Sequence, residues 1–489
     1  MATAAGKTSP LMDNKKYVGN SEFVLYLVSV FFYTMMTGAL DSYRNDYLVN
    51  VLTLSDSDVS TYNTIVSVVP FVLNFFIAMY IDSRKTNKGG KFRPLALAIA
   101  VPCGIFLVLS FWTPSGLSGT LLMIYLITIA IAWSICTSFG DCVNKVAIVM
   151  TPNMKERDNV MSFRSIAAAV GNSAPLVVEL VLAIFIDDKA VKYILVASLC
   201  GVVGVITMLI GMRQVKERVV YSNEKKNPLA GFKDVVTCPY SWNVIISEFL
   251  KNFRKISTYM GIFLAEALMG QGKYLLFSLP TGIGTAVGML LINMLLKKFN
   301  SRVLYIASGI YSVIANVAAF GVGYAYLKNG GAALQIVFIV FLFLIGLQFG
   351  ASNLLPLMFQ ADVLEAIEYK TGKRLDASLP FVVSVGTTIS GTIATAAAPK
   401  ILYGTNPSII GYIQASDGVN QVQSDRTKIM LLFVYTIVHG IMMFLAGVPY
   451  FFYKLTGTRK EDIHNAVIEQ RAKLAEQNGE GAEDTQTAK

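Results

Sequence analysis

The stretch Ile81-Asp-Ser-Arg-Lys-Thr-Asn-Lys-Gly-Gly-Lys-Phe-Arg-Pro94 is a short basic segment between two long apolar ones. Gly89, Gly90 and Pro94 prevent a helix from running through it, because glycine is conformationally permissive and proline lacks the N–H that a helix needs. Its cations are Arg84, Lys85, Lys88, Lys91 and Arg93. An excess of lysine and arginine in a short loop is typical of the cytoplasmic side of a membrane. The segment is therefore predicted to be a cytoplasmic turn between two membrane-spanning helices.

The composition predicts a protein that lies in a lipid bilayer. Of its 489 residues, 54% are hydrophobic and 15% are charged, whereas a soluble domain carries roughly 25% charged residues. The apolar residues form runs of about 20 or more, the length that crosses the hydrocarbon core. A transmembrane barrel would show short alternating segments instead. The predicted fold class is an all-α polytopic membrane protein.

Charge and cysteine content exclude several other classes. The net charge of +10 lies in alternate loops, as the positive-inside bias requires, so it does not indicate nucleic-acid binding. The cysteines show neither metal-ligand nor paired redox spacing, and most lie in apolar runs, where a free thiol behaves as a small hydrophobe; they are Cys103, Cys136, Cys142, Cys200 and Cys238. Residues 1–20 are polar and lack the apolar region of a cleavable signal peptide. No metal or organic cofactor is expected.

Twelve membrane spans are predicted, at residues 23–50, 61–81, 94–113, 119–149, 163–186, 191–212, 242–269, 274–296, 302–327, 332–360, 378–404 and 428–453. Lysine and arginine are frequent in every second loop, and the alternating loops 54–60 and 113–119 contain no cations. Both termini are therefore expected on the cytoplasmic side of a plasma or inner membrane.

The spans divide into two halves of six. The predicted parts are a cytoplasmic N-terminus (1–22), a first bundle (23–212), a linker (213–241), a second bundle (242–453) and a cytoplasmic tail (454–489). The basic turn at 82–93 has a counterpart in Lys297-Lys-Phe-Asn-Ser-Arg302 between spans 8 and 9. Two related bundles with a site between repeats are a known transporter architecture.

Three stretches together resemble one family, the glycoside-pentoside-hexuronide:cation symporters of the major facilitator superfamily, which includes melibiose permease. The basic turn Asp82 to Pro94 is similar to the family's loop between spans 2 and 3. The other two stretches, similar to its 4–5 loop and to the end of its span 10, are Met150-Thr-Pro-Asn-Met-Lys-Glu-Arg157 with Phe163-Arg164, and Ala361-Asp-Val-Leu-Glu-Ala-Ile-Glu-Tyr-Lys-Thr-Gly-Lys-Arg374. The resemblance covers about residues 20 to 470.

The resemblance implies two six-helix bundles, the major facilitator fold, importing a sugar or glycoside by alternating access. It implies sugar binding by Asp141 on span 4 and Arg164 at the start of span 5. The motif residues expected to form a cytoplasmic gate are Asp82, Arg93, Glu156, Arg157, Asp362, Lys370 and Arg374.

The sequence departs from the family where the coupling cation is bound. The family's pair of span-2 carboxylates falls here at Pro70 and Asn74, and the span-11 stretch Val382 to Gly391 contains no charge. Without anionic ligands a sodium site loses most of its electrostatic attraction. Coupling to protons, or simple facilitation, is therefore expected in place of sodium coupling.

Charged side chains within predicted spans need a partner or a water-filled cavity. On span 1, Asp41 and Arg44 are three residues apart and either form a cavity-facing pair or, with Asp46, snorkel to the outer end. On span 4, Asp141, Asn144 and Lys145 share one helix face and either line the substrate site or brace the bundle. Trp133 on the same span is a further candidate, for stacking on a sugar ring.

Span 7 carries the densest charge. Glu248, Lys251, Arg254 and Lys255 recur at helical spacing and either contact substrate or form salt bridges between the bundles. A span that began only after Lys255 would be roughly 22 Å long, too short to cross. Glu179 and Glu266 stand as lone acids in apolar surroundings, as proton carriers or structural hydrogen-bonding groups. His439 is expected to be a packed histidine.

The sequence therefore favours a monomeric secondary active or facilitative transporter of a sugar or glycoside. The excess of intramembrane cations suggests an anionic, hexuronide-like solute. The coupling candidates are Asp41, Arg44, Asn74, Glu179 and Glu266. The alternatives are a transporter of a lipid-like or other non-sugar solute on the same fold, and a membrane sensor or receptor. No Walker-type motif or nucleophile–base constellation indicates an enzyme.

Overall fold

The structure is a computed structural model of the 489-residue chain. It describes residues 16–83, 90–151, 154–218, 232–271, 273–371, 378–404, 409–416, 421–457, 459–460, 462–463 and 465–467.

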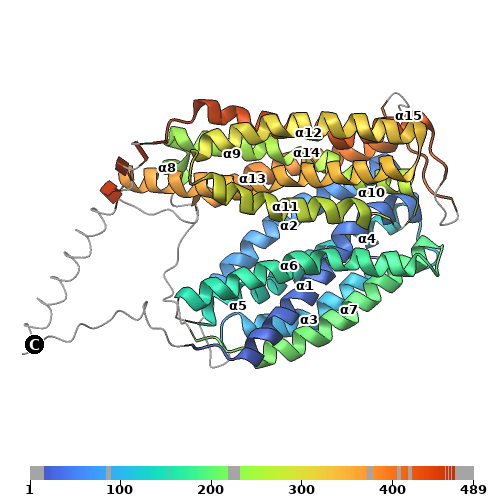
Figure 1. Cartoon of the computed structure of the whole chain (residues 1–489). Helices are drawn as coiled ribbons and strands as arrows, with labels where there is room; N and C mark the ends of the chain where they lie inside the picture. The colour runs from blue at the N-terminus through green and yellow to red at the C-terminus, as the bar shows by residue number, and fades with distance from the viewer. Residues whose placement is uncertain are drawn as a thin grey trace, which may run out of the picture. The chain divides into compact units, whose positions relative to one another are not determined.

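The described chain is built from helices (Figure 1). In its first part these are α1 (Asn20–Asp46), η2 (Tyr47–Val51), α2 (Asp56–Ser83), α3 (Arg93–Leu109), α4 (Gly119–Gly140), α5 (Cys142–Val149), α6 (Met154–Leu182) and α7 (Lys189–Gln214). They continue as α8 (Phe232–Thr237), α9 (Pro239–Asn252), α10 (Lys255–Met269), α11 (Leu275–Leu295), α12 (Ser301–Asn329), α13 (Ala332–Thr371) and α14 (Ser378–Tyr403). The last are α15 (Asp425–Phe433), η3 (Val434–Val438), α16 (His439–Gly447) and η4 (Val448–Phe452).

Ten helical segments of the described chain are long and apolar enough to cross a membrane. They coincide with ten of the twelve predicted spans. Of the other two, span 3 is the 17-residue α3, and span 7 is divided into α9 and α10. The expectation of a multi-span helical membrane protein is confirmed, and the structure adds that the predicted span at 242–269 is not one continuous helix.

The chain divides into two compact units. The first consists of Met1–Lys225, Ile262–Leu275 and Ala396–Thr427, and the second of Lys226–Gly261, Leu276–Thr395 and Lys428–Lys489. The second part of span 7 and the end of span 11 thus belong to the first unit, although they follow the predicted linker in sequence. The division at 213–241 stays a prediction.

In the first unit, α1 lies against α6 and α7 (Figure 1). Small residues allow the close approach: a Cβ atom on Gly204 of α7 would collide with Met36 of α1. Ser29 of α1 is fully buried, and its hydroxyl donates a hydrogen bond to the carbonyl of Thr207, 3.1 Å away on α7. The first and sixth spans of this half are therefore joined by both packing and a hydrogen bond.

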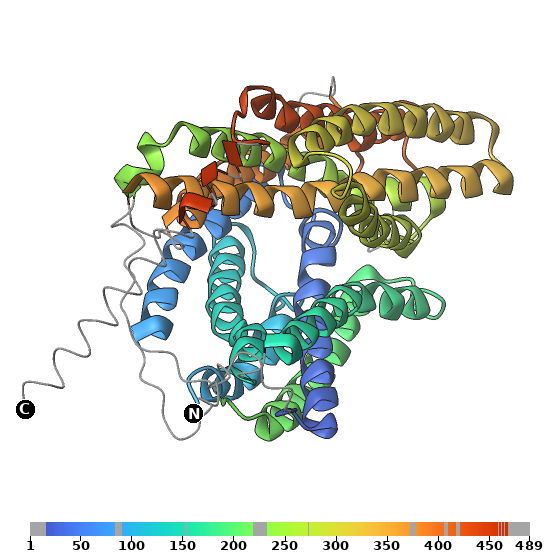
Figure 2. The ribbon, with the colours of Figure 1, turned by 60° about the vertical axis from the view of Figure 1, so that its left-hand side comes forward.

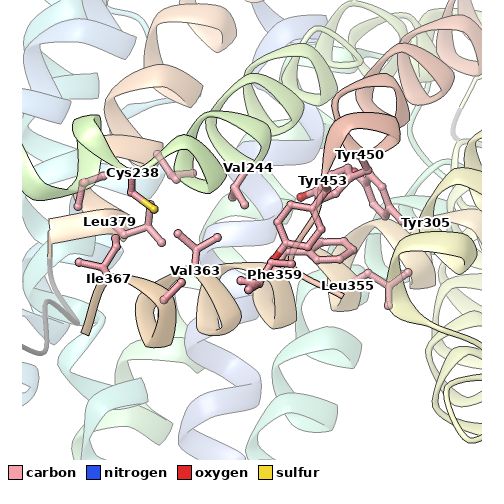
Figure 3. Close-up of a cluster of buried hydrophobic side chains, with 14 of the residues drawn as sticks. Cys238, Val244, Tyr305, Leu355, Phe359, Val363, Ile367, Leu379, Tyr450 and Tyr453 are labelled. Carbon is pink, nitrogen blue, oxygen red and sulfur yellow. The ribbon is translucent and has the colours of Figure 1, made fainter. Parts of the chain in front are cut away.

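The second unit repeats this arrangement. Ser247 of α9 is fully buried, and its hydroxyl donates to the carbonyl of Ala446 on α16, 2.7 Å away. Helices α12 and α13 lie side by side (Figures 1 and 2). One end of the unit is filled by an aromatic cluster around Phe359 of α13, whose ring centroid lies 4.2 Å from that of Tyr450 (Figure 3). Tyr305 and Tyr453 complete this cluster.

The two basic turns have the same structural role. Arg93, at the start of α3, donates from Nε to the carbonyl of Met212 at 2.8 Å and from Nη2 to that of Arg213 at 2.7 Å. Arg302, at the start of α12, donates from Nε to the carbonyl of Tyr450 at 2.9 Å and from Nη2 to that of Phe451 at 2.5 Å. Each guanidinium thus satisfies two of the carbonyls that a helix C-terminus leaves without partners. The sequence similarity between the turns reflects a real structural repeat.

Candidate functional site

Asp141 lies at the junction of α4 and α5, within predicted span 4. Its side chain is exposed, and its Oδ1 accepts a hydrogen bond from the hydroxyl of buried Tyr33 at 3.0 Å. Asn144 and Lys145 lie on the following turn and are partly buried. The predicted polar face of span 4 is therefore present, with a tyrosine of α1 orienting its carboxylate.

Arg164 lies on α6 and is partly buried. Its Nε is buried without a hydrogen-bond partner in the described chain, and its Nη2 makes a long contact of 3.4 Å with the Ser165 hydroxyl. It is close enough to the Tyr26 hydroxyl to interact with it electrostatically. A guanidinium in this setting keeps donors available for a ligand that accepts hydrogen bonds.

Two other predicted residues of this unit lie in different settings. Trp133 is only 8% exposed and belongs to the buried interior. Asn74 of α2 accepts a hydrogen bond from the Ser138 hydroxyl of α4 at 2.5 Å. The amide at the position of the family's coupling carboxylates thus connects two helices.

The charged stripe of span 7 lies around the break between α9 and α10. Lys251 Nζ lies 2.6 Å from Glu248 Oε1 and donates to the Ser352 carbonyl of α13 at 3.3 Å. The Asn252 amide donates to the Thr387 carbonyl of α14. Lys255 is exposed, and a Cβ atom on Gly391 of α14 would lie 2.8 Å from its Nζ. Polar groups of α9 and α10 therefore point toward α13 and α14 of the same unit.

Arg254 stands at this break. Its guanidinium lies over the Phe349 ring, 4.7 Å from the centroid. The buried His439 ring packs against the Phe349 ring, and the two ring centroids are 4.9 Å apart. Of the salt bridges between described residues, none involves Arg254. Stacking on an aromatic ring holds the fork of donors in place and leaves it available to an anion.

A buried charge network in the first unit was not foreseen from sequence. Lys189 of α7 is fully buried, and its Nζ lies 2.8 Å from Asp46 Oδ2 and 2.6 Å from Glu266 Oε2. Asp46 also accepts hydrogen bonds from the Tyr193 hydroxyl and, at 2.6 Å, from the Asn50 amide. Sequence reasoning missed Lys189 because it lies in the predicted loop 187–190, where a lysine is ordinarily solvated.

This network corrects two expectations. Glu266 is paired with Lys189, and Glu179 lies 3.6 Å from Lys192 Nζ, so the prediction that both are lone acids is wrong. Asp46 is fully buried, so it does not snorkel to the surface. On the same helix Asp41 is exposed, and Arg44 lines a small pocket beside Tyr62 and Ser110.

Two predicted gate residues of the first unit, Arg93 and Glu156, lie in hydrogen-bonded anchors at the ends of helices. The Glu217 carboxylate accepts hydrogen bonds from the backbone N–H groups of Lys91 at 2.7 Å, Phe92 at 2.9 Å and Arg93 at 2.6 Å. Gly90 has a φ of +96°, and a Cβ atom there would lie 2.5 Å from the Glu217 carboxyl carbon. The turn therefore requires glycine at this position both for its backbone conformation and for space.

Glu156 anchors the 4–5 loop. Its carboxylate accepts hydrogen bonds from the Thr151 hydroxyl at 2.5 Å and from the backbone N–H groups of Val18 at 3.0 Å and Tyr17 at 3.1 Å. Burial alone raises the pKa of Glu156, but these hydrogen bonds outweigh burial, so its pKa lies below the ordinary value of 4.5.

The remaining predicted gate residues lie in the second unit or outside the described chain. Asp362 is buried, and its Oδ1 lies 2.7 Å from Lys460 Nζ. Lys370 is exposed at the end of α13. The side chains of Asp82 and Arg157, and the whole of Arg374, lie outside the described part. Among the described residues, no three His, Cys, Asp or Glu side chains are placed to bind a metal ion.

Comparison with known proteins identifies the family. Residues 25–457 match the model of the MFS/sugar transport protein family. The chain belongs to this family. This confirms the resemblance to the glycoside-pentoside-hexuronide:cation symporters, and it makes the chain a transporter of the major facilitator superfamily and not an enzyme.

Relatives of this MFS/sugar transport protein include other symporters. An uncharacterised symporter of Bacillus subtilis (strain 168) is 26% identical over 395 residues, 78% of this chain and 81% of the relative. An inner membrane symporter of Escherichia coli (strain K12) is 24% identical over 379 residues, 75% and 76% of the two chains.

A solved structure supports the fold. The xylose transporter of E. coli in its inward-open conformation superposes with a TM-score of 0.59 over 91% of this chain and 98% of that one, at 12% identity. The predicted major facilitator fold is therefore confirmed.

Proposed function

We propose that this transporter carries a sugar or glycoside bearing an anionic group, by alternating access and without sodium coupling. The observation that carries the proposal is Arg254, a stacked guanidinium that forms no salt bridge among the described residues, while the nearby Glu248 is ion-paired with Lys251. Arginine binds carboxylates through two parallel hydrogen bonds, which gives both affinity and orientation.

The charge balance of each unit supports this proposal. The stripe at the α9–α10 break holds the cations Lys251, Arg254 and Lys255 and the anion Glu248, so three positive charges less one negative leave +2. The polar face of the first unit holds Lys145 and Arg164 against Asp141, which leaves +1. An excess of cations within a membrane protein is costly unless anions enter the site. An anionic solute would supply them.

Ligand-induced thermal stabilisation of the purified chain tests the anionic preference. A panel of glucuronides and their neutral glucosides is tested on wild type, R254Q and R254K. The control variant is K328Q, at the end of α12. We expect glucuronides to stabilise wild type and K328Q and to lose about tenfold or more in affinity in R254Q. Lysine in R254K should restore only part of the binding, because it lacks the planar fork. Stabilisation by neutral glycosides alone would overturn the proposal.

The distribution of loop charge bears on the topology. We infer that both termini lie in the cytoplasm and that the chain acts as a monomer in a plasma or inner membrane. Support comes from the excess of lysine and arginine in alternate loops. Protease digestion of a C-terminal tag in right-side-out vesicles tests the orientation, and cleavage without membrane disruption would contradict it.

A further inference from the structure

The buried charges around Lys189 do not balance. The Lys189 network comprises three carboxylates and two ammonium groups, each less than 10% exposed: Asp46, Glu179, Glu266, Lys189 and Lys192. With every group ionised, three negative charges and two positive charges leave −1. An uncompensated buried charge is strongly unfavourable, and a buried group with a readily exchanged proton becomes neutral instead.

The contacts identify Glu179 as the least stabilised anion. Asp46 and Glu266 each lie within 2.8 Å of Lys189 Nζ, and Asp46 has two further hydrogen-bond donors in Tyr193 and Asn50. Glu179 lies 3.6 Å from Lys192 Nζ, beyond hydrogen-bond distance. No hydrogen bond from another described residue reaches it.

The other titratable groups around Glu179 do not correct the imbalance. Tyr43 of α1 and Tyr193 of α7 interact with it electrostatically and stack on each other with ring centroids 4.9 Å apart. Tyr274 and Tyr412 lie nearby. All four are phenols, which are neutral near pH 7.

We propose that the Lys189 network is a proton-binding site. Glu179 holds one proton while Glu266 is bound to Lys189, and Glu179 releases this proton when Glu266 moves away from Lys189. The inference rests on the proposed function, because it needs a protein that alternates between conformations. Glu266 lies on α10, the outer part of span 7. Alternating access separates the first six spans from the last six on each side in turn.

Charge counting links the proton to this movement. With Glu266 in place and Glu179 protonated, Asp46 and Glu266 balance Lys189 and Lys192. When Glu266 departs, Asp46 alone faces two lysines, and a net charge of +1 remains. Transfer of the Glu179 proton to water restores neutrality. One proton is therefore bound when the network forms and released when it opens.

Infrared spectroscopy of the full chain in lipid nanodiscs, without any solute, detects this proton directly. We expect a protonated carboxylic C=O band near neutral pH in wild type, absent in E179Q. In E266Q the Lys189 network has one carboxylate fewer, so Glu179 should lose its proton more readily. The band should therefore disappear at a pH about one unit or more below that in wild type. E22Q is the matched control, because Glu22 is ion-paired with Arg218 at 2.7 Å and should not contribute to the band.

The outcomes separate the two proposals. No such band in wild type, its persistence in E179Q, or an unchanged midpoint in E266Q would overturn the proton site. Because this measurement uses no solute, a failure of glycosides to bind leaves its result intact.

Thiol labelling tests the link to movement. Met269, one turn after Glu266 on α10, is 8% exposed, and the five native cysteines are buried. The rate at which a membrane-impermeant maleimide labels the introduced thiol is measured as a function of pH in M269C and in M269C/E179Q. We expect the increase of this rate with pH to be several-fold larger in M269C. The thiol itself titrates equally in both, so the ratio of the two rates isolates the network. Identical pH profiles would overturn the coupling of proton release to opening.

Discussion

At the scale of single residues, Gly90 and Glu217 show how a short turn is fixed by a distant carboxylate. Three successive backbone N–H groups converge on Glu217, and Gly90 supplies the positive φ that exposes them. Charge-assisted hydrogen bonds of this kind are about twice as strong as neutral ones. The end of the basic turn, residues 90–93, is therefore held by the acid that follows span 6.

Replacement of Gly90 by alanine is expected to destabilise the protein by about 1–3 kcal/mol, because it combines an unfavourable φ with a collision against Glu217. Thermal unfolding in detergent measures the effect. Gly116 is the matched control, since its φ is +100° but nothing lies within 4 Å of a Cβ atom there. G116A should cost about 1 kcal/mol, and equal losses in the two variants would show that Glu217 contributes nothing.

Glu156 gives a pH-dependent contribution with a defined sign. Its folded-state pKa lies below 4.5, so the folded state favours the carboxylate, and the stabilisation is present above the unfolded value and lost as pH falls through the folded value. The melting temperature of wild type should exceed that of E156Q at about pH 7, and the gap should narrow toward about pH 4. A gap that widens on acidification would contradict the hydrogen-bond assignment.

At the scale of elements, helix ends and helix breaks set the polar architecture. Span 7 is interrupted between Asn252 and Lys255, and Arg254 lies at this interruption. At the end of the sixth span of each half, backbone carbonyls accept hydrogen bonds from an arginine at the start of the third span. This arginine is Arg93 in one unit and Arg302 in the other. These arginines cap carbonyls that the helices cannot satisfy themselves.

Loss of either arginine cap should weaken its own unit. R93M and R302M are each expected to lower stability by about 1–3 kcal/mol, since a cation donating to helix carbonyls contributes this much. R93K and R302K should retain part of the effect, because an ammonium has no planar fork with which to bridge two carbonyls. Thermal unfolding compares the four variants, and an unchanged R93M would show that the cap is energetically irrelevant.

At the scale of the whole molecule, the distribution of acids among the spans supports the proposal of coupling without sodium. In span 2 the residues between Asp58 and Asp82 include no acid, and Asn74 is engaged with Ser138. Three buried acids of spans 1, 5 and 7, Asp46, Glu179 and Glu266, are instead grouped around Lys189 and Lys192. A hard cation such as sodium needs several oxygen ligands in one place, preferably charged ones.

Uptake by proteoliposomes is therefore expected to be the same in sodium and in choline buffers at fixed pH. An imposed pH gradient, acidic outside, should accelerate uptake in wild type and not in E179Q. N74D serves as a comparison, because it places a carboxylate at the family's position. Clear acceleration of wild-type uptake by sodium would contradict this expectation.

The sequence by itself predicted the positions of the ten long apolar helices, the basic turns and the family, because hydropathy, loop charge and motif spacing are local properties of the chain. It also predicted Asp141, Arg164 and the span-7 stripe as site residues, and their roles stay predictions. Only the tertiary structure decided how charges pair. Lys189 meets Asp46 and Glu266 across 143 and 77 residues of sequence. Glu217 reaches the basic turn across 124 to 126 residues. Such partners are selected by helix packing in three dimensions, and no local pattern records them.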